Sequence, residues 1–235
     1  MFGLTPADAL ALGWFALLVG GYSYATRYGA LARRGLVAAI SAQRYAWMKG
    51  MADRNNRMVD IQVLNNLSRG NGFFASTSVL VTGAFAALFG AYDIQALLDR
   101  IPLLHASTPF VWQLKVLFEM SIFVFAFFKF AWAFRLSHYT AIMVGATPNP
   151  THSNARRRHA HAAETAKLAC LVGEHSNIGL RAYYFGLAGL GWFIHPAVFM
   201  LTTALVVLVL YRREYHSRAL AAIKGSLGAR RRGGK

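Results

Sequence analysis

Acidic residues and cysteine are scarce in this chain, and both shortages limit what it can do. Only nine of its 235 residues are Asp or Glu, against 25 Lys or Arg, and Cys170 is the only cysteine. A single cysteine excludes an intramolecular disulfide and a Cys-rich metal site. The sequence also lacks a Gly-rich phosphate loop, a nucleophile elbow and paired carboxylates within an apolar run. We therefore predict no catalytic residue, no cofactor and no metal ion, and expect a protein that is not an enzyme.

Charged residues as a whole are also few. They make up 14% of the chain, whereas hydrophobic residues make up 56%, and soluble domains carry about a quarter charged residues. The basic residues lie in blocks between apolar runs, which is typical of loops that face an anionic membrane leaflet. This pattern predicts an integral membrane protein whose cytoplasmic face contacts anionic lipids, and it argues against a nucleic-acid partner.

Four apolar regions are long enough to cross a membrane, at about 8–26, 73–92, 112–134 and within 178–211. No Lys or Arg precedes the first region, and Thr5, Pro6 and Asp8 are typical of a helix start, so we expect a retained span and not a signal peptide. Eight Lys/Arg lie in 27–72, one in 93–114, six in 135–181 and eight in 212–235. The positive-inside rule therefore predicts an outside N-terminus, with 27–72 and 135–181 in the cytoplasm.

The last apolar region is too long for one upright crossing. Its 34 residues would extend about 50 Å as a helix, against a hydrocarbon core of about 30 Å. A single crossing would also export the basic C-terminal segment. Since proline favours a turn, we predict that His195 and Pro196 form an outer turn between short spans at 178–194 and 196–212, with Trp192 as an interfacial anchor. The alternative is one helix kinked at the proline.

These predictions define an all-α, polytopic fold with about five spans, N-out and C-in. One helical membrane domain covers 1–217, with long amphipathic cytoplasmic helices in 27–72 and 135–177. Apolar positions recur at steps of three and four in 36–68, which predicts a helix on the membrane surface or a span continued into the cytoplasm. Residues 218–235 are expected to form a basic, disordered tail.

Ionisable residues occur inside the third apolar region. Lys115, Glu119 and Lys129 share one helical face, and such residues are costly in a membrane unless they face a bundle interior or water. We predict them as pore or ligand residues, with Arg135 and Arg181 near the inner mouth. Glu119 can pair with Lys115 four residues away. Lys129 can snorkel, or face water, a lipid phosphate or Glu119 of a neighbouring subunit.

Small residues form a surface on the second apolar region. The members of this surface are Ser78, Thr82, Gly83, Ala87 and Gly90. Small residues let helix backbones approach closely, so the surface predicts close packing within the bundle or between protomers.

Three segments together resemble a known family. "NNLSRGNGFFASTSVLVTGAFAALFG", "FKFAWAFRLSHYTAIMVGATP" and "NIGLRAYYFGLAGLGWFIHPAVFM", with the earlier "RYAWM", are similar to the DUF599 membrane proteins of bacteria and plants. The resemblance implies a multi-span helical fold. It implies no activity and no site residue, because the function of that family is unknown.

The function predicted from these features is that of a bacterial inner (plasma) membrane protein that forms an oligomeric pore, a transporter or a lipid-binding bundle. A small bundle leaves little room for an enclosed pathway, so we expect a homo-oligomer. The alternative is a structural or accessory subunit of a larger membrane protein complex.

Overall fold

Every regular element that the structure describes is a helix, and three of these helices are longer than a membrane is thick. The computed structural model describes residues 3–28, 30–90, 108–151 and 153–232, and no strand occurs among them. The elements are α1 (Pro6–Tyr28), the 3-10 helix η1 (Ala30–Arg33), α2 (Leu36–Ala52), α3 (Met58–Phe89), α5 (Pro109–Gly145), α6 (Ala155–Gly189), α7 (Gly191–Ile194), α8 (Pro196–Tyr215) and α9 (Arg218–Arg232). With 32, 37 and 35 residues, α3, α5 and α6 extend about 50 Å each.

Four helical stretches within the described residues are long and apolar enough to cross a membrane. They are α1, α3, α5 and the stretch that begins at Pro196 in α8. Length and hydropathy of this kind are characteristic of a multi-span membrane protein. The predicted all-helical, membrane-type fold is therefore confirmed at this level.

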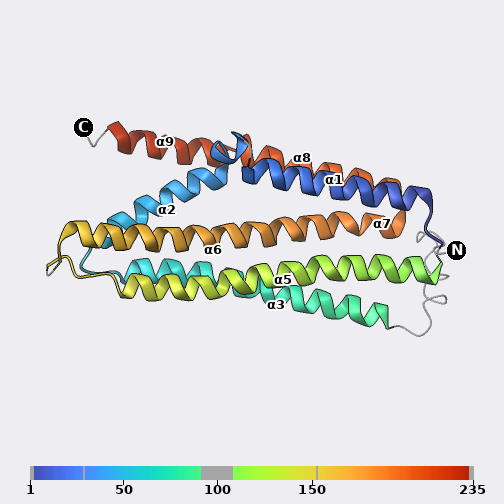
Figure 1. Cartoon of the computed structure of the whole chain (residues 1–235), viewed down its shortest axis with the longest axis horizontal. Helices are drawn as coiled ribbons and strands as arrows, with labels where there is room; N and C mark the ends of the chain where they lie inside the picture. Colours follow the sequence, from blue (N-terminus) through green and yellow to red (C-terminus); the bar gives the residue numbers. More distant parts are fainter. Residues whose placement is uncertain (1–2, 29, 91–107, 152, 233–235) are drawn as a thin grey trace.

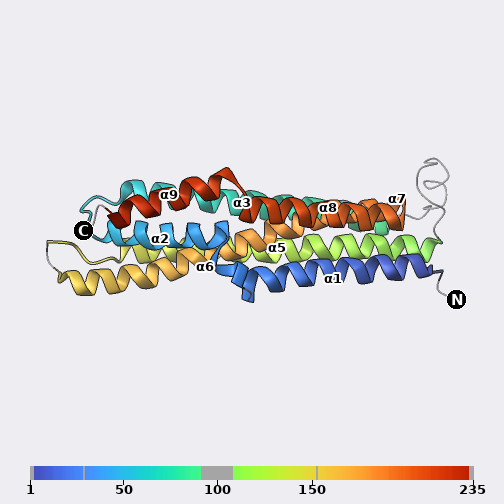
Figure 2. The same cartoon turned by 90° about the horizontal axis from the view of Figure 1, so that it is seen from above.

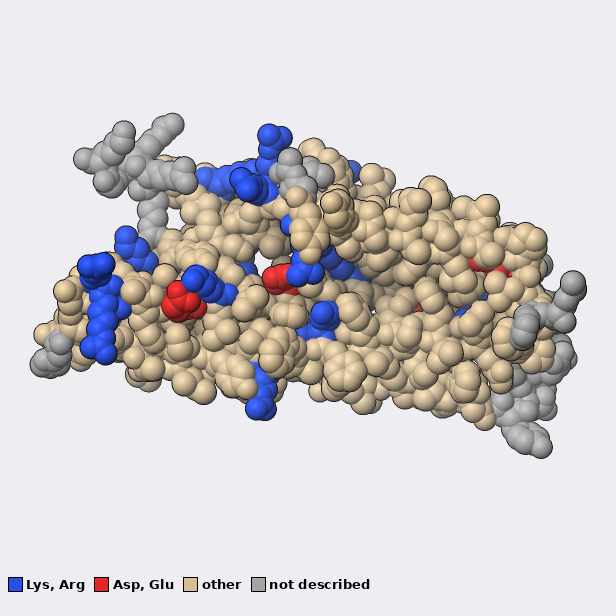
Figure 3. Space-filling view, in the orientation of Figure 1, with Lys and Arg blue, Asp and Glu red and all other residues tan. Residues whose placement is uncertain are grey.

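The long helices connect an apolar half of the molecule to a basic half. α1 and α8 lie beside one end of α5 and α6, whereas α2 and α9 lie beside the other end (Figures 1 and 2). Lys and Arg side chains gather over the half with α2 and α9 and over the middle, while the opposite half is almost free of them on the visible face (Figure 3). Residues 58–72 belong to the same helix as residues 73–89. Met58 to Phe89 therefore form one continuous helix, and α2 is a separate helix before it.

The chain reverses direction at His195-Pro196. α6 ends at Gly189, α7 follows, and His195 is extended (φ −163°, ψ 144°) before α8 begins at Pro196. α6 and α8 then run side by side in opposite directions (Figures 1 and 2), and the Thr202 hydroxyl donates to the Ala188 carbonyl oxygen at 2.8 Å. The His195 Nδ1 accepts from the Ala197 N–H at 3.1 Å. The histidine therefore caps α8, a role that the sequence argument did not give it.

Two local expectations are wrong. Trp192 is not an interfacial anchor, because it is 1% exposed and stacks on Phe199 with a centroid distance of 5.5 Å. The tail from residue 218 is not disordered in its described part, because Arg218–Arg232 form α9. Leu220 of α9 is buried, and the Ser226 hydroxyl accepts from Gln43 of α2 at 2.6 Å. These contacts hold α9 against the rest of the protein, which its basic, Gly-containing composition does not predict.

Glycines on α6 allow the closest helix packing in the described residues. A Cβ atom added at Gly179 would lie 2.7 Å from the Phe130 ring, and one added at Gly186 would lie 2.9 Å from the Phe123 ring. At Gly189 the added atom would collide with the Glu119 carboxylate. Side chains of α5 therefore occupy the space that these glycines leave on α6.

Candidate functional site

A cavity of 910 Å³ lies near the middle of the molecule, between α1, α2, α5, α6 and α8. We call it the central cavity. Its volume is in the range of pockets that hold a whole small ligand. Its charged lining residues are Arg27, Lys129, Glu174, Arg181 and Glu214, and its larger apolar lining residues are Phe15, Val19, Ile122, Phe125, Ile178 and Phe185.

Apolar and charged side chains occupy different ends of the central cavity. α1 and α5 both run from the apolar half toward the middle of the molecule (Figure 1). Along α1, Phe15 therefore lies deeper in the apolar half than Arg27, and along α5 Ile122 lies deeper than Lys129. The cavity is thus apolar within the apolar half and cationic where the basic half begins.

Two ion pairs hold the charged end together. Arg27 of α1 lies 3.5 Å from Glu174 of α6, and Arg181 of α6 lies 3.8 Å from Glu214 of α8. Arg181 Nη1 also donates to the Thr26 hydroxyl at 2.9 Å, and its guanidinium carbon is 5.0 Å from the centroid of the Tyr22 ring. Arg181 therefore joins α6 to both α1 and α8, and its position in the cavity is well defined.

Lys129 is the cation at this end that no acidic side chain of the described residues neutralises. Its Nζ lies 5.1 Å from the Phe125 ring centroid, and it takes part in no ion pair with a described residue. The charged lining residues are three cations, Arg27, Lys129 and Arg181, and two acids, Glu174 and Glu214. The charged end of the cavity therefore carries a net positive field that a bound anion would neutralise.

The central cavity is partly open to the surface. Its exposed lining residues include Arg27, whose side chain is 62% exposed, and Phe125, which is 48% exposed. The space-filling view shows an opening near the middle of the molecule with basic and acidic side chains beside it (Figure 3). A ligand could therefore enter from the side of the bundle.

A second polar group of residues lies at the far end of the apolar half. The Trp192 Nε1 donates to Asp8 Oδ1 at 2.8 Å, and the Lys115 Nζ donates to the Trp192 carbonyl oxygen at 2.9 Å. The Asp8 N–H donates to the Thr5 hydroxyl at 3.2 Å, which confirms the predicted helix start at Thr5. Asp8, Lys115 and Trp192 are all buried, so these bonds join α1, α5 and α7 inside the apolar half.

Glu119 lies one turn further along α5 and is fully buried. Neither carboxylate oxygen accepts a hydrogen bond from a described residue. The spacing of Lys115 and Glu119 predicts a pair, but Lys115 donates to Trp192. An ionised carboxylate without partners is costly in such surroundings, so this site favours the neutral carboxyl.

The predicted candidates therefore fall in three places. Lys129 and Arg181 meet at the central cavity, whereas Lys115 and Glu119 lie in the apolar half away from it. Arg135 is on the surface, where its Nε donates to the Tyr139 hydroxyl at 2.9 Å.

The small-residue surface of α3 is only partly used within the protomer. Ser78 is buried, and its hydroxyl lies 2.9 Å from that of Tyr183. The Thr82 hydroxyl donates to the Ser78 carbonyl oxygen at 2.7 Å within the same helix. Gly83, Ala87 and Gly90 are exposed, and a Cβ added at Gly83 would meet nothing within 4 Å.

Sequence reasoning missed three of the charged residues at the central cavity. Arg27, Glu174 and Glu214 lie near the ends of apolar runs, where single charges are common, and their pairing depends on how the helices pack. The available signal was that Glu174 and Glu214 each occur beside a predicted span, although acids are scarce throughout the chain.

An exposed charged cluster at the tip of the basic half joins α6 to the segment after α2. Asp53 accepts from Arg158 at 3.2 Å and lies 3.0 Å from the His159 Nε2. The hydrogen bond to His159, together with that to Arg158, holds the pKa of Asp53 below its ordinary value. Among the residues that the structure describes, no group of three or more His, Cys, Asp or Glu side chains is placed to hold a metal ion.

Comparison with known proteins gives one match. The family described as "Protein of unknown function, DUF599" matches residues 10–219, which is most of the chain. Neither the curated proteins nor the solved structures contain a match.

Proposed function

The chain belongs to the DUF599 family of proteins of unknown function, and we propose that it is a membrane-embedded bundle that binds an anionic amphiphile in the central cavity. The ligand class is a molecule with an acyl or similar apolar chain and an acidic headgroup. Of the functions expected from the sequence, this is the lipid-binding one.

The observation that carries this proposal is the division of the cavity into an apolar end and a cationic end. Phe15, Ile122 and Phe185 would surround an apolar chain, while Lys129 at the other end would meet its acidic headgroup. A lysine ammonium without an acidic partner is suited to a phosphate or carboxylate. The exposure of Arg27 and Phe125 at the edge of the cavity supports entry from the side of the bundle.

Aromatic packing favours a binding site over a pore within one protomer. Phe15, at the apolar end of the cavity, packs against Phe118 and Phe199 with centroid distances of 5.2 Å each. Trp192 stacks on Phe199 directly behind them. These rings, of which Trp192 and Phe199 are fully buried, close the apolar end, so a ligand chain would end there.

The membrane orientation that fits this function is N-out and C-in, with five crossings in the bacterial inner membrane. The fifth crossing results from counting residues 178–194 and 196–212 as separate spans on either side of the His195-Pro196 turn. Basic residues are concentrated in the half with α2 and α9, and the positive-inside rule favours the cytoplasm for that half. Lys129 and Arg181 would then lie near the inner leaflet, where anionic headgroups are found.

A binding titration tests the proposal. Protein in zwitterionic detergent micelles is titrated with a fluorescent fatty-acid analogue, and binding is followed by fluorescence enhancement. Lys129→Gln should weaken binding about 10- to 100-fold, because a lost charged hydrogen bond costs about 1.5–3 kcal/mol. Arg135→Gln is the matched control, since it removes one positive charge from the same helix at an exposed position outside the cavity.

Two results would count against this function. Wild-type protein that shows no saturable binding to the fatty-acid analogue or to a phospholipid with an acidic headgroup would exclude it. If Lys129→Gln and Arg135→Gln lower the affinity for the analogue equally, the cause is the net charge of the protein and not a site at Lys129.

A second candidate function is a homo-oligomeric or accessory subunit that associates through α3. The exposed small residues Gly83, Ala87 and Gly90 favour this role, because they offer a close-approach surface that no described helix of the protomer covers. Gly83→Leu should then lower the mass of the particle purified in mild detergent. Release of further copies would identify a homo-oligomer, and release of another polypeptide would identify a larger complex.

A further inference from the structure

A smaller cavity of 70 Å³ lies on the other side of α6 from the central cavity, between α2, α3, α5 and α6. We call it the Arg44 pocket. Its lining includes the polar side chains of Arg44, Asn71 and Ser176 and no acidic side chain. Ser137 also lines it, but the Ser137 hydroxyl already donates to the Ala133 carbonyl oxygen at 2.9 Å.

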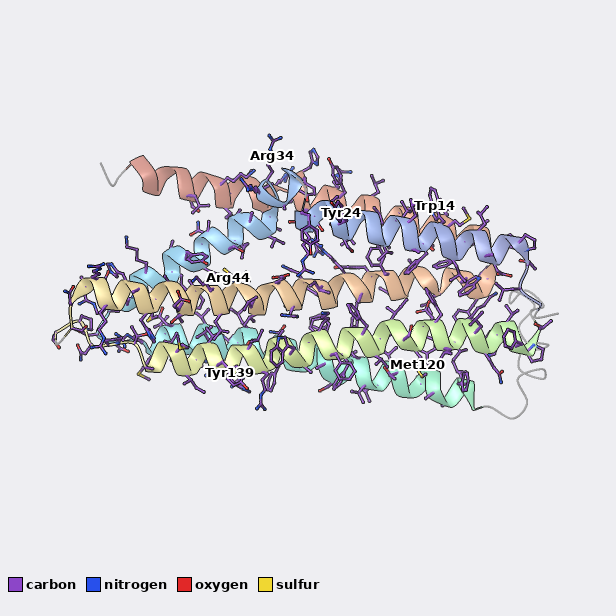
Figure 4. The ribbon with its side chains drawn as sticks, viewed as in Figure 1. Trp14, Tyr24, Arg34, Arg44, Met120 and Tyr139 are labelled. Atoms are coloured by element: carbon purple, nitrogen blue, oxygen red, sulfur yellow. The ribbon has the colours of Figure 1, made fainter. Side chains whose placement is uncertain are left out.

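Arg44 reaches from α2 toward α6 and lies over Gly173 (Figure 4). A Cβ atom at position 173 would collide with the guanidinium, so the glycine makes room for it. Glycine inside a helix is less favourable than alanine. The space at Gly173 is therefore reserved for the Arg44 side chain.

The guanidinium of Arg44 is incompletely satisfied. Its Nη1 is shielded from solvent and makes no hydrogen bond to a described residue, and Arg44 forms no ion pair within the described part of the chain. Asp60 on α3 pairs with Arg54 at 2.6 Å and accepts from Trp47 at 2.7 Å through Oδ1, and no ion pair joins it to Arg44. Burial lowers the pKa of Arg44, and the Cys170 thiol only partly offsets this effect. A buried cation of this kind is costly unless an anion accompanies it.

Two further polar side chains line the same pocket. Asn71 of α3 is 4% exposed, and Ser176 belongs to α6. With Arg44 they offer a guanidinium, an amide and a hydroxyl from three different helices, α2, α3 and α6.

We propose that the Arg44 pocket binds one small monovalent inorganic anion, such as chloride. The single positive charge of the lining matches a single negative charge. The volume of 70 Å³ is enough for a small ion, since a site for one water molecule needs about 10–15 Å³ on the same measure, and it is far below the 910 Å³ of the central cavity. The bound anion would connect α2 to α3 and α6.

Halide titration tests this site in the full-length protein. In gluconate buffer of constant ionic strength, added chloride or bromide should raise the Tm by about 3 °C and then saturate. Arg44→Gln should abolish the rise. Arg34→Gln should retain it, since Arg34 is also basic but is exposed and extends away from the helices (Figure 4).

Equilibrium binding of radioactive chloride to wild-type protein keeps the test independent of the variants. Saturation near one ion per chain would support the site even if Arg44→Gln does not fold. A Tm that does not depend on halide, together with no saturable chloride binding, would overturn the proposal. A halide effect that persists in folded Arg44→Gln protein would also overturn it.

Discussion

Gly179 of α6 lies against the ring of Phe130, and replacing this glycine by alanine should destabilise the bundle. The added Cβ atom would lie 2.7, 2.8 and 2.9 Å from three ring carbons of Phe130. That ring is fully buried, stacked on Phe74 at 5.1 Å and edge-on to Tyr183 at 5.7 Å. It cannot move without displacing both neighbours.

The magnitude follows from two opposing effects. Overpacking a well-filled core costs about 1–3 kcal/mol. Gly→Ala inside a helix gains about 0.5–1 kcal/mol from reduced backbone freedom in the unfolded chain. We therefore expect a net loss of up to about 2.5 kcal/mol in the free energy of unfolding for Gly179→Ala.

Gly20→Ala is the matched control. Gly20 also lies in an apolar helix, but a Cβ there would meet nothing within 4 Å, so only the helix gain remains. The free energy of unfolding can be measured in mixed micelles of increasing SDS content by tryptophan fluorescence. The two variants should differ by about 1–3 kcal/mol. Equal values would refute the argument that α6 needs its glycines for close contact with α5.

Three further predictions concern the outer polar residues, the tip of the basic half and the membrane orientation. Trp192→Phe removes the buried N–H donor to Asp8 and should lower the free energy of unfolding by about 1.5–3 kcal/mol; an unchanged value would mean that water replaces the donor. The hydrogen bond to His159 lowers the pKa of Asp53 in the folded protein. Ionised Asp53 therefore stabilises the fold above the pKa of the unfolded carboxyl, and this stabilisation is lost as pH falls through the folded-state pKa. Thermal scans below pH 4 should therefore show a small loss, under about 1 kcal/mol, that Asp53→Asn protein lacks. Ser226→Cys in a chain without its native cysteine should react with impermeant thiol reagents only after the inner membrane is opened, and labelling of intact spheroplasts would contradict the C-in orientation.

The reversal of the chain at His195-Pro196 could be predicted because two independent constraints meet there. The apolar run is too long for one crossing, and the basic tail disfavours export. Both constraints depend on composition and length, which a single sequence contains. The capping bond from Ala197 to His195 depends on one side-chain conformation and could not be inferred from either constraint.

The choice of packing surface was harder to predict. Gly83 and Ala87 on α3 and the glycines of α6 have similar small-residue patterns. Gly179, Gly186 and Gly189 of α6 each face an α5 side chain, whereas a Cβ at Gly83 would meet nothing within 4 Å. The spacing of small residues identifies where another helix can pack closely, but it does not identify which helix packs there. The signal on α6 was the sequence of small residues Gly179, Ala182, Gly186 and Gly189, at steps of three and four.

Neither cavity could be predicted from the sequence, because each is lined by four or five helices that are distant along the chain. Lys129 was a candidate because a charge inside a membrane is costly, and Arg181 because it lies near the predicted inner mouth; both line the central cavity. Arg44 was not a candidate, since it is one of eight Lys or Arg in residues 27–72, a basic segment that the positive-inside rule already explains. Its solvent-shielded Nη1 and its close approach to Gly173 appear only in the structure.

The two cavities share their walls, and this arrangement makes a final prediction. Ser41 of α2 lines the central cavity, whereas Arg44, one turn later, lines the smaller pocket. On α6, Glu174 faces the central cavity and Gly173 the Arg44 pocket. An anion that fixes Arg44 would also fix the wall of the central cavity, so the two ligands should affect each other's affinity by the same factor. Titrating the fatty-acid analogue in chloride and in gluconate measures this factor directly, and identical affinities in both buffers would show that the sites are independent.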